Sequence, residues 1–394
     1  MPRLLVLTGD HSADAHAAAL IAALREMDPA WSIAGVGGDA MAGAGIEIIS
    51  DHRDMNVIGP GGVVRAVPSH WRLAKKILAW VDANKPDVAV LIDYGVFHLW
   101  LGPRLRKRGV KVLYFIPPQI WASRPWRLKK LRRAADEVLC ILPFEEDYYR
   151  RNGIPATFVG NPLVNRLPLV VSKEEFAARH GLDPGKTLIG LFPGSRRMEI
   201  NLLLGEQVGA AKLLDQRFPG RLQFVMSKAK NLKENLFEDA FNRAGGGELA
   251  SLRVLEESHA LLCASDVALV KSGTTTLEAT LYRTPMIVMY RGPWYAYQLA
   301  RVLMTVKHIS LPNNLVGERL VPELWQDEVN ARTIANEAAK LLDPEAHAKM
   351  ERELGAIAAQ FADVNTPRRV AEAVERLSAR GRKSPDSAAL RPGA

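Results

Sequence analysis

Short apolar runs alternate with amphipathic stretches along almost the whole chain, and this alternation limits its fold more than any other feature. Short runs without a polar face are typical of strands buried on both sides of a parallel sheet. The stretches between them are long enough for crossover helices. The sequence therefore predicts an α/β protein. The expected strands are Leu4–Leu7, Ser32–Val36, Val88–Ile92, Val112–Phe115, Glu137–Ile141, Leu188–Phe192, Gln223–Val225, Val267–Val270 and Met286–Met289. The expected helices include Ala13–Glu26, Ser69–Asn84, Asn201–Arg217 and Thr274–Tyr282.

The length of 394 residues suits two domains better than one. Two X-Pro pairs interrupt the pattern between Asn161 and Glu175, where we expect the junction. The prediction is two doubly wound, Rossmann-like domains that face a cleft, at 1–165 and 166–364. A further helix is expected within 365–380, packing on the first domain as one alternative, and a disordered polar tail at 381–394.

Composition favours a soluble globular protein, since 48% of residues are hydrophobic and 24% are charged. The net charge of +9 favours anionic partners, among them nucleic acid, acidic lipid surfaces and phosphorylated substrates. No apolar stretch approaches the length of a membrane-spanning helix, so any membrane contact is expected to be peripheral.

Two candidate phosphate-binding turns follow strands in the second half of the chain. The first contains Gly194-Ser195-Arg196, and the second contains Ser272-Gly273-Thr274. A strand that turns through small residues into a helix offers backbone N–H groups and the positive end of the helix dipole. Arg196 adds a planar fork that can hold two phosphate oxygens. Together the turns predict a site for a nucleoside diphosphate.

Both turns also have a purely structural interpretation. The first is compatible with an ordinary strand-to-helix turn that carries a surface arginine. In the second, Thr275 and Glu278 have the spacing of a capping box. Alternatively, the carboxylate of Glu278 accepts both hydroxyls of a ribose.

Polar residues at two strand ends of the first half are candidates for the other substrate. Asp93 follows the strand Val88–Ile92, where a carboxylate can act as a general base or cap the next helix. The turn Gly9–His16 carries Asp10, Ser12 and Asp14, which suit either a sugar or phosphate contact or helix capping. The spacing of its two histidines does not match a metal-binding pair, so no metal is expected.

Two further sequence features have both a structural and a functional interpretation. Gly35–Gly38 imitates a dinucleotide fingerprint but follows the second strand, so we interpret it as a glycine-rich turn. Aromatic and basic residues are mixed in Ile116–Lys130 and Trp294–Met304. Such mixtures suit core packing or a peripheral contact with acidic lipid.

Nine segments, taken in order and spacing, carry a family resemblance. They are Gly9–Asp14, Gly35–Gly38, Ile92–Asp93, Ile116–Ala122, Leu142–Glu145, Phe158–Pro162, Leu191–Arg196, Ser272–Glu278 and Ser310–Leu315. Over nearly its full length the chain resembles the lipid-A-disaccharide synthases, inverting glycosyltransferases of family 19 with the GT-B fold. It departs from the family pattern at Asp10 and Ala13, where the family usually has Glu and Gly.

The resemblance implies a reaction and a set of roles. UDP-2,3-diacylglucosamine would react with 2,3-diacylglucosamine 1-phosphate to give the β(1→6) disaccharide 1-phosphate and UDP. Asp93 would be the general base, Glu278 would hold the ribose, and Asn313 matches a polar position near the site. The diphosphate would be held by Ser195, Arg196 and the turn Ser272–Thr274. The family needs no metal or other cofactor. It implies a cytoplasmic protein at the inner face of the cytoplasmic membrane, with a homodimer as one candidate assembly. No nucleic acid partner is expected, because the sequence contains no recognisable RNA- or DNA-binding module.

Rival functions stay open from the sequence. One is another UDP-sugar enzyme of the same fold, either a different glycosyltransferase or a UDP-N-acetylglucosamine 2-epimerase. Another, from a different class, is a non-catalytic paralogue that binds nucleotide sugar or lipid.

Overall fold

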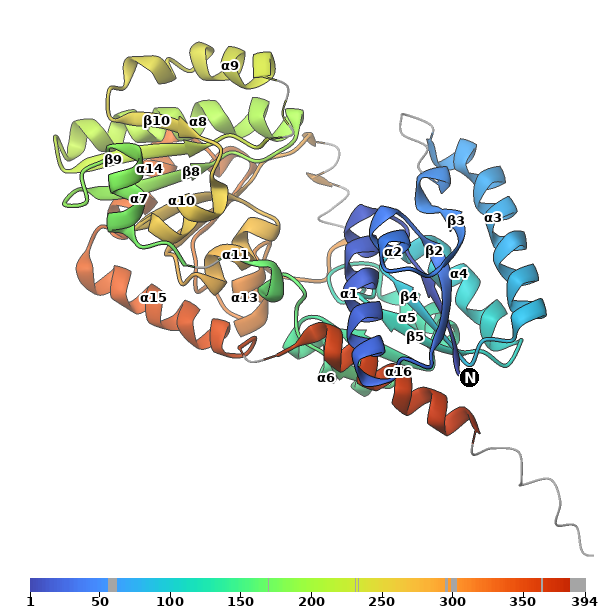
Figure 1. The fold of residues 1–394 in the computed structure, drawn as a ribbon. Coiled ribbons are helices and arrows are strands. Elements are labelled where there is room, and N and C mark those ends of the chain that lie inside the picture. The colour runs from blue at the N-terminus through green and yellow to red at the C-terminus, as the bar shows by residue number, and fades with distance from the viewer. Residues whose placement is uncertain are drawn as a thin grey trace, which may run out of the picture. The chain divides into compact units, whose positions relative to one another are not determined.

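A computed structural model describes residues 1–394 except 56–61, 169, 231, 233, 295–296, 299–302, 363 and 383–394 (Figure 1). The chain divides into two compact units. Unit 1 is Met1–Asn165 with Asp363–Ala394, and unit 2 is Arg166–Ala362. The predicted disordered tail lies mostly outside the described residues, as does much of Trp294–Met304.

Unit 1 contains a seven-stranded parallel sheet in the order β3-β2-β1-β4-β5-β6-β7. Its strands are β1 Arg3–Leu7, β2 Ser32–Gly37, β3 Glu47–Asp51, β4 Val88–Ile92, β5 Lys111–Phe115, β6 Glu137–Cys140 and β7 Ala156–Phe158. Its helices are α1 His11–Met27, α2 Asp39–Gly43, α3 Gly62–Asn84, α4 Gly95–Arg106, α5 Leu128–Ala134, α6 Pro143–Arg151 and α16 Thr366–Arg382, with short 3₁₀ turns η1 His52–Met55 and η2 Pro125–Arg127.

Two apolar layers cover the two faces of this sheet. Leu4 and Val6 of β1 point to the layer that contains residues of α1 and α16, whereas Leu5 and Leu7 point to the layer with α3, α4 and α5. This alternation is the period-2 rule of a strand, and both faces are buried because crossover helices cover both. In Figure 1, α16 lies beside α1 on one side of the sheet, with α3 and α4 on the other.

The helix α16 follows unit 2 in the chain but belongs to unit 1. Val370 and Val374 are fully buried in the same layer as β1 and β4. Arg376 also pairs with Glu137 of β6 at 2.7 Å. Apolar packing and an ion pair therefore both fix the C-terminal helix on the first sheet.

Unit 2 repeats the architecture with a six-stranded parallel sheet in the order β10-β9-β8-β11-β12-β13. Its strands are β8 Thr187–Phe192, β9 Leu222–Ser227, β10 Leu252–Leu255, β11 Val267–Lys271, β12 Met286–Tyr290 and β13 Glu323–Trp325. Its helices are α7 Lys173–His180, α8 Arg197–Arg217, α9 Glu234–Arg243, α10 Ser258–Ala264, α11 Thr274–Leu281, α13 Leu311–Val316, α14 Ala331–Lys340 and α15 Pro344–Ala359. The predicted α/β architecture of two doubly wound units is confirmed.

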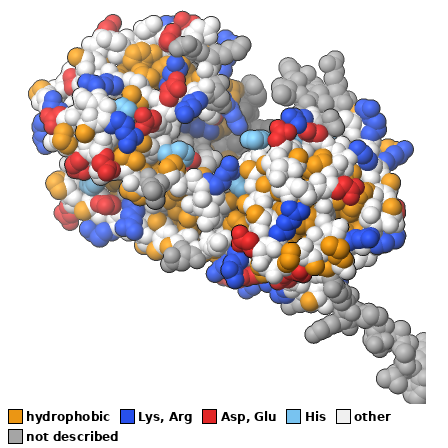
Figure 2. Space-filling model, in the orientation of Figure 1, with side chains coloured by type: hydrophobic (Ala, Val, Ile, Leu, Met, Phe, Trp, Pro, Cys, Tyr) orange, Lys and Arg blue, Asp and Glu red, His pale blue; other side chains and the backbone are white. Residues whose placement is uncertain are grey.

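Acidic and basic side chains are interspersed over the surface drawn in Figure 2. Among the described residues no helix is both long enough and apolar enough to cross a membrane.

Candidate functional site

The two candidate phosphate turns of unit 2 lie next to each other. They follow β8 and β11, which pair in parallel with Phe192 opposite Val270. Each turn opens a helix, because α8 begins at Arg197 and α11 at Thr274. Since parallel strands end at the same edge of the sheet, both helix N-termini are at the edge where α/β sheets bind ligands.

The first turn is built on Gly194, whose φ of +111° favours glycine. A Cβ at this position would lie 2.4 Å from Oε2 of Glu199. That oxygen accepts the N–H groups of Ser195 and Arg196, at 2.9 and 3.2 Å. The backbone donors expected to face a phosphate are therefore used internally, which corrects the sequence prediction. The side chains of Ser195 and Arg196 are exposed and available instead.

The second turn keeps its backbone donors. Ser272 donates its N–H to Met289 and its hydroxyl to the carbonyl of Ile309, so its role is to fix the loop. The N–H groups of Gly273, Thr274 and Thr275 carry no hydrogen bond to any described residue. The predicted donor set thus shifts by one residue along the chain.

Sequence reasoning missed the residue that connects the two turns. Lys271, the last residue of β11, places its Nζ 2.9 Å from Oε1 of Glu199. Burial opposes the charge on Glu199, but Lys271 and the two amides of the first turn outweigh it and hold the pKa of Glu199 below its ordinary value. A lysine at the end of one strand and a glutamate in the first turn of α8 were the only signals in the sequence.

Glu278 lies in α11, one turn after the second loop. The helix begins with Gly273 as its N-cap and no side-chain cap, so the capping-box alternative is wrong. Burial raises the pKa of the half-buried Glu278 carboxyl, and nearby His259 opposes this shift. Within the described part of the chain, the carboxylate makes no hydrogen bond, and Nδ1 of His259 is buried without a partner. An acceptor and a second polar atom are thus left for a ligand.

Asn313 is fully buried and uses all its polar atoms within the protein. Its Nδ2 donates to the carbonyl of Val321 and to Glu323, and its Oδ1 accepts the N–H groups of Leu320 and Val321. Asn313 therefore organises the loop after α13.

In unit 1, Asp93 follows β4 in an uncommon backbone conformation. Asp93 and Tyr94 have φ values of +51° and +53°, and two successive non-glycine residues in this region are strained. The carbonyl of Asp93 accepts hydrogen bonds from His98 Nδ1 at 2.7 Å and Tyr114 Oη at 2.9 Å. Burial lowers the pKa of His98 to about 4, so its ring is neutral and its Nδ1 must carry the proton that it donates. These two bonds hold the backbone of Asp93 in this conformation.

The carboxylate of Asp93 is not used as a helix cap, because the N-cap of α4 is Tyr94. The side chain is exposed at the edge of the sheet. Partial removal from water raises the pKa of Asp93, and the negative charge of Asp10 raises it further. A carboxylate with a raised pKa at a strand end has the properties of a general base.

Asp10 lies close to Asp93 because β1 and β4 pair in parallel. Asp10 is the N-cap of α1, and its Oδ1 accepts the N–H of Ala13 at 2.8 Å. Ser12 is exposed, with its hydroxyl 3.4 Å from Nε2 of His16. The structure brings Asp10 and Asp93 together, as expected for residues that follow neighbouring strands.

Asp14 does not lie at the surface with them. It is fully buried, and its carboxylate accepts the N–H groups of Gly38, Ala40 and Met41. It therefore organises the turn after β2. A Cβ on Gly38 would lie 2.4 Å from the ring of His52, so this turn needs glycine for packing. Within the described residues no group of His, Cys, Asp and Glu could hold a metal ion.

Comparisons with known proteins identify the family. The sequence profile described as Lipid-A-disaccharide synthetase matches residues 4–374. A lipid-A-disaccharide synthase of Myxococcus xanthus is 37% identical over 382 residues, covering 97% of this chain and 99% of the relative. One from Trichlorobacter lovleyi is 39% identical, covering 86% and 88%.

Solved structures support the fold alone, because their sequences are distant. A UDP-GlcNAc 2-epimerase of Neisseria meningitidis bound to UDP-GlcNAc has a TM-score of 0.61 at 13% identity, covering 95% of this chain and 100% of that one. MurG of Acinetobacter baumannii has a TM-score of 0.57 at 14% identity, with the same coverage. Both the profile and the relatives point to one conclusion: the chain belongs to the lipid-A-disaccharide synthetase family and is a glycosyltransferase of lipid A biosynthesis.

Proposed function

We propose that the chain transfers the sugar of UDP-2,3-diacylglucosamine to the 6-hydroxyl of 2,3-diacylglucosamine 1-phosphate. A bond forms between the acceptor oxygen and the anomeric carbon, and the bond from that carbon to the diphosphate breaks. The products are the β(1→6) disaccharide 1-phosphate and UDP. Family membership supports this chemistry.

Asp93 is the general base in this proposal and takes the proton of the attacking hydroxyl. A base is most effective when its pKa approaches the working pH, and partial burial and Asp10 both raise the pKa of Asp93. His98 and Tyr114 hold its carbonyl, so the backbone that carries the carboxylate is fixed before substrate arrives. Asp10 and Ser12 line the same edge of the sheet and would contact the acceptor.

The donor diphosphate would be held by unit 2. The observation that carries this assignment is the pair of adjacent helix N-termini, with donors in the turn Gly273–Thr275 and the exposed side chains of Ser195 and Arg196. Negative charge builds on the diphosphate as it leaves, and fixed donors stabilise it with little reorganisation. Glu278 would accept the ribose hydroxyls. In this proposal Ser272, Asp14 and Asn313 support loops and do not touch substrate.

We also propose a cellular location and an oligomeric state for the enzyme. The substrates carry acyl chains, so we place the enzyme in the cytoplasm, peripherally at the inner face of the cytoplasmic membrane. A homodimer is the proposed assembly, which analytical ultracentrifugation would test. The reaction, as written, requires no metal or other cofactor.

The deciding experiment supplies both proposed substrates in detergent and follows UDP and disaccharide together. We expect the two products in equal amounts. UDP release without acceptor would indicate a hydrolase, and an altered sugar would indicate an epimerase. Asp93→Asn should lower kcat by about 10²–10⁴-fold, the usual contribution of a general base, with UDP binding retained. A near-normal rate would remove Asp93 from this role.

A further inference from the structure

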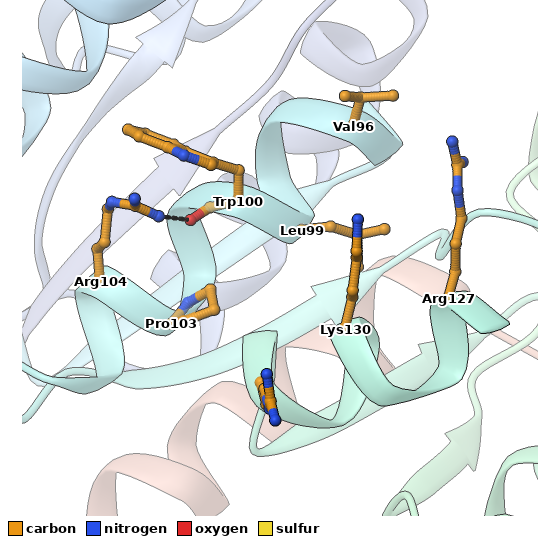
Figure 3. A pocket seen from close by; sticks show the side chains of 8 residues that line it. Val96, Leu99, Trp100, Pro103, Arg104, Arg127 and Lys130 are labelled. Carbon is orange, nitrogen blue, oxygen red and sulfur yellow. Dashed lines mark hydrogen bonds between the residues drawn. The ribbon is translucent and has the colours of Figure 1, made fainter.

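A cavity on the surface of unit 1 is lined by apolar side chains and by cationic side chains. It has a volume of about 360 Å³ and lies between α4 and the segment η2–α5 (Figure 3). We call it the α4–α5 surface. It is lined by Val96, Leu99, Trp100, Pro103, Arg104, Arg127, Lys130 and Arg133. Half of these side chains are apolar, half are cationic, and none is acidic.

Two of the four apolar side chains that line the cavity are exposed to solvent, whereas Leu99 is buried. Val96 is 74% exposed and Trp100 is 37% exposed on α4. Trp126, on η2 beside the cavity-lining Arg127, is 58% exposed. Exposed aromatic and aliphatic side chains side by side indicate a surface that contacts something apolar.

The cationic wall is not neutralised within the protein. None of Arg104, Arg127, Lys130 and Arg133 forms an ion pair with a carboxylate in the described part of the chain. Arg104 instead stacks on Trp100, with its guanidinium carbon 3.5 Å from the ring centroid, and donates to the Trp100 carbonyl. In Figure 3, Arg127 and Lys130 rise from the lower helical segment toward the level of Leu99 and Val96.

The positive charge continues beyond the cavity. The segment Arg124–Arg133 contains six cations and no acid. A neighbouring cavity shares Arg133 and adds Arg106, Lys107 and Lys111, and its single acid, Asp136, pairs with Arg106 at 2.9 Å. So many unpaired cations exceed what one phosphate needs. They match a surface that presents many anions.

We propose that the α4–α5 surface docks the enzyme on anionic phospholipid, with Val96, Trp100 and Trp126 entering the headgroup region and the cations contacting lipid phosphates. Apolar insertion combined with basic residues is the physical signature of peripheral binding to acidic membranes. The inference deepens the peripheral association proposed above. It also fits the position of Asp93, which lies three residues before Val96 and just ahead of the helix α4 that carries Val96. When the α4–α5 surface is bound to the membrane, Asp93 would lie near the membrane surface, where it can reach the hydroxyl of a membrane-embedded acceptor.

Co-sedimentation with vesicles tests the surface. Wild-type protein should bind vesicles of phosphatidylcholine mixed with phosphatidylglycerol, and bind pure phosphatidylcholine weakly. The triple change Arg127→Gln, Lys130→Gln and Arg133→Gln should weaken binding to the anionic vesicles about a hundredfold, from roughly fivefold for each cation near the surface. Val96→Ser should weaken it about fivefold through lost apolar contact.

A matched control removes the same charge elsewhere. Arg217, Arg332 and Arg352 are exposed on unit 2, and their triple change to Gln should leave vesicle binding within a fewfold of wild type. Equal losses in both triple variants would reduce the effect to net charge and overturn the proposal. Wild-type affinity for anionic vesicles in the variant with Arg127, Lys130 and Arg133 changed would also overturn the proposal. If that variant kept vesicle binding but lost binding to a labelled oligonucleotide, the α4–α5 surface would be a nucleic acid site instead. Circular dichroism melts confirm folding of each variant.

The test separates this proposal from the enzymatic one. Disaccharide formation by the wild-type protein in detergent micelles does not require docking on vesicles. Absence of disaccharide with intact, cation-dependent vesicle binding would reject only the proposed reaction. Disaccharide formation without selective binding to anionic vesicles would reject only the α4–α5 surface.

Discussion

Glu199→Gln is the change that best probes the donor half of the account. Glu199 accepts the amides of Ser195 and Arg196 on one oxygen and pairs with Lys271 on the other. Glutamine is the same size but has only one accepting oxygen. If that oxygen faces the amides, its NH₂ group faces the ammonium of Lys271. If the side chain turns over, the NH₂ group faces the amides. In either orientation the glutamine NH₂ group, a hydrogen-bond donor, faces another donor, so one set of contacts is lost.

The expected loss follows from the contacts. Hydrogen bonds to a charged group contribute about 1.5–3 kcal/mol, and the lower part of this range applies because Lys271 is 26% exposed. We expect unit 2 to lose about 1.5–2 kcal/mol. For a unit of this size each kcal/mol shifts the unfolding midpoint by ~2–4 °C, so the midpoint should fall by roughly 3–8 °C. The loosened turn should also weaken UDP binding.

The pH dependence gives the sharper test. The pKa of Glu199 is lowered in the folded protein, so its stabilisation is complete above the ordinary glutamate value of 4.5. It is lost as the pH falls through the lower, folded-state pKa. Calorimetric melts should therefore show the full difference between wild type and variant near pH 7. The difference should narrow below about pH 4.5.

A matched control changes a pair with similar distance but more solvent. Glu248 pairs with Lys212 at 2.7 Å and is 76% exposed, so Glu248→Gln should hardly move the midpoint. An unchanged midpoint for Glu199→Gln at pH 7 would show that these contacts do not stabilise unit 2. A midpoint difference that is the same at every pH would show that the charge on Glu199 contributes nothing to stability.

Three further substitutions test neighbouring parts of the site. Arg196→Ala should weaken UDP binding by ~1.5–3 kcal/mol in titration calorimetry, the range for a charge-assisted hydrogen bond, and unchanged affinity would remove this contact. Asp10→Asn keeps a good N-cap but removes a charge that raises the pKa of Asp93, so the acid limb of the kcat/KM profile should move to lower pH; a shift to higher pH would contradict the assignment. Gly194→Ala places a methyl group against Glu199 at a φ of +111° and should lower the unfolding midpoint, whereas a rise would show that the turn tolerates a side chain.

The central strands of both sheets could be predicted from sequence, and the edge strands could not. The four strands that the apolar pattern missed are β3, β7, β10 and β13, which lie at the four edges of the two sheets. A strand with one neighbour is less buried and lacks a continuous apolar run, as the half-exposed pattern of Glu47–Asp51 illustrates. Continuous apolar runs in the sequence therefore identified only the central strands of the two sheets.

The site was predictable to the extent that it depends on strand ends. Asp93 and the two glycine-containing turns follow strands whose apolar runs are clear, so their position at the edge of a sheet follows from the pattern. Lys271 and His98 act through partners that are distant in the chain or across a turn, and only the fold brings these contacts together. Asn313 is instructive in the opposite sense, because a motif position proved to be a buried loop support.

A structure of the protein crystallised with UDP would test the central claim most directly. We expect diphosphate oxygens within hydrogen-bond distance of the N–H groups of Gly273–Thr275 and of the Arg196 guanidinium, with the ribose hydroxyls at Glu278. Ordered UDP bound in unit 1, or bound in unit 2 with these groups unengaged, would contradict it.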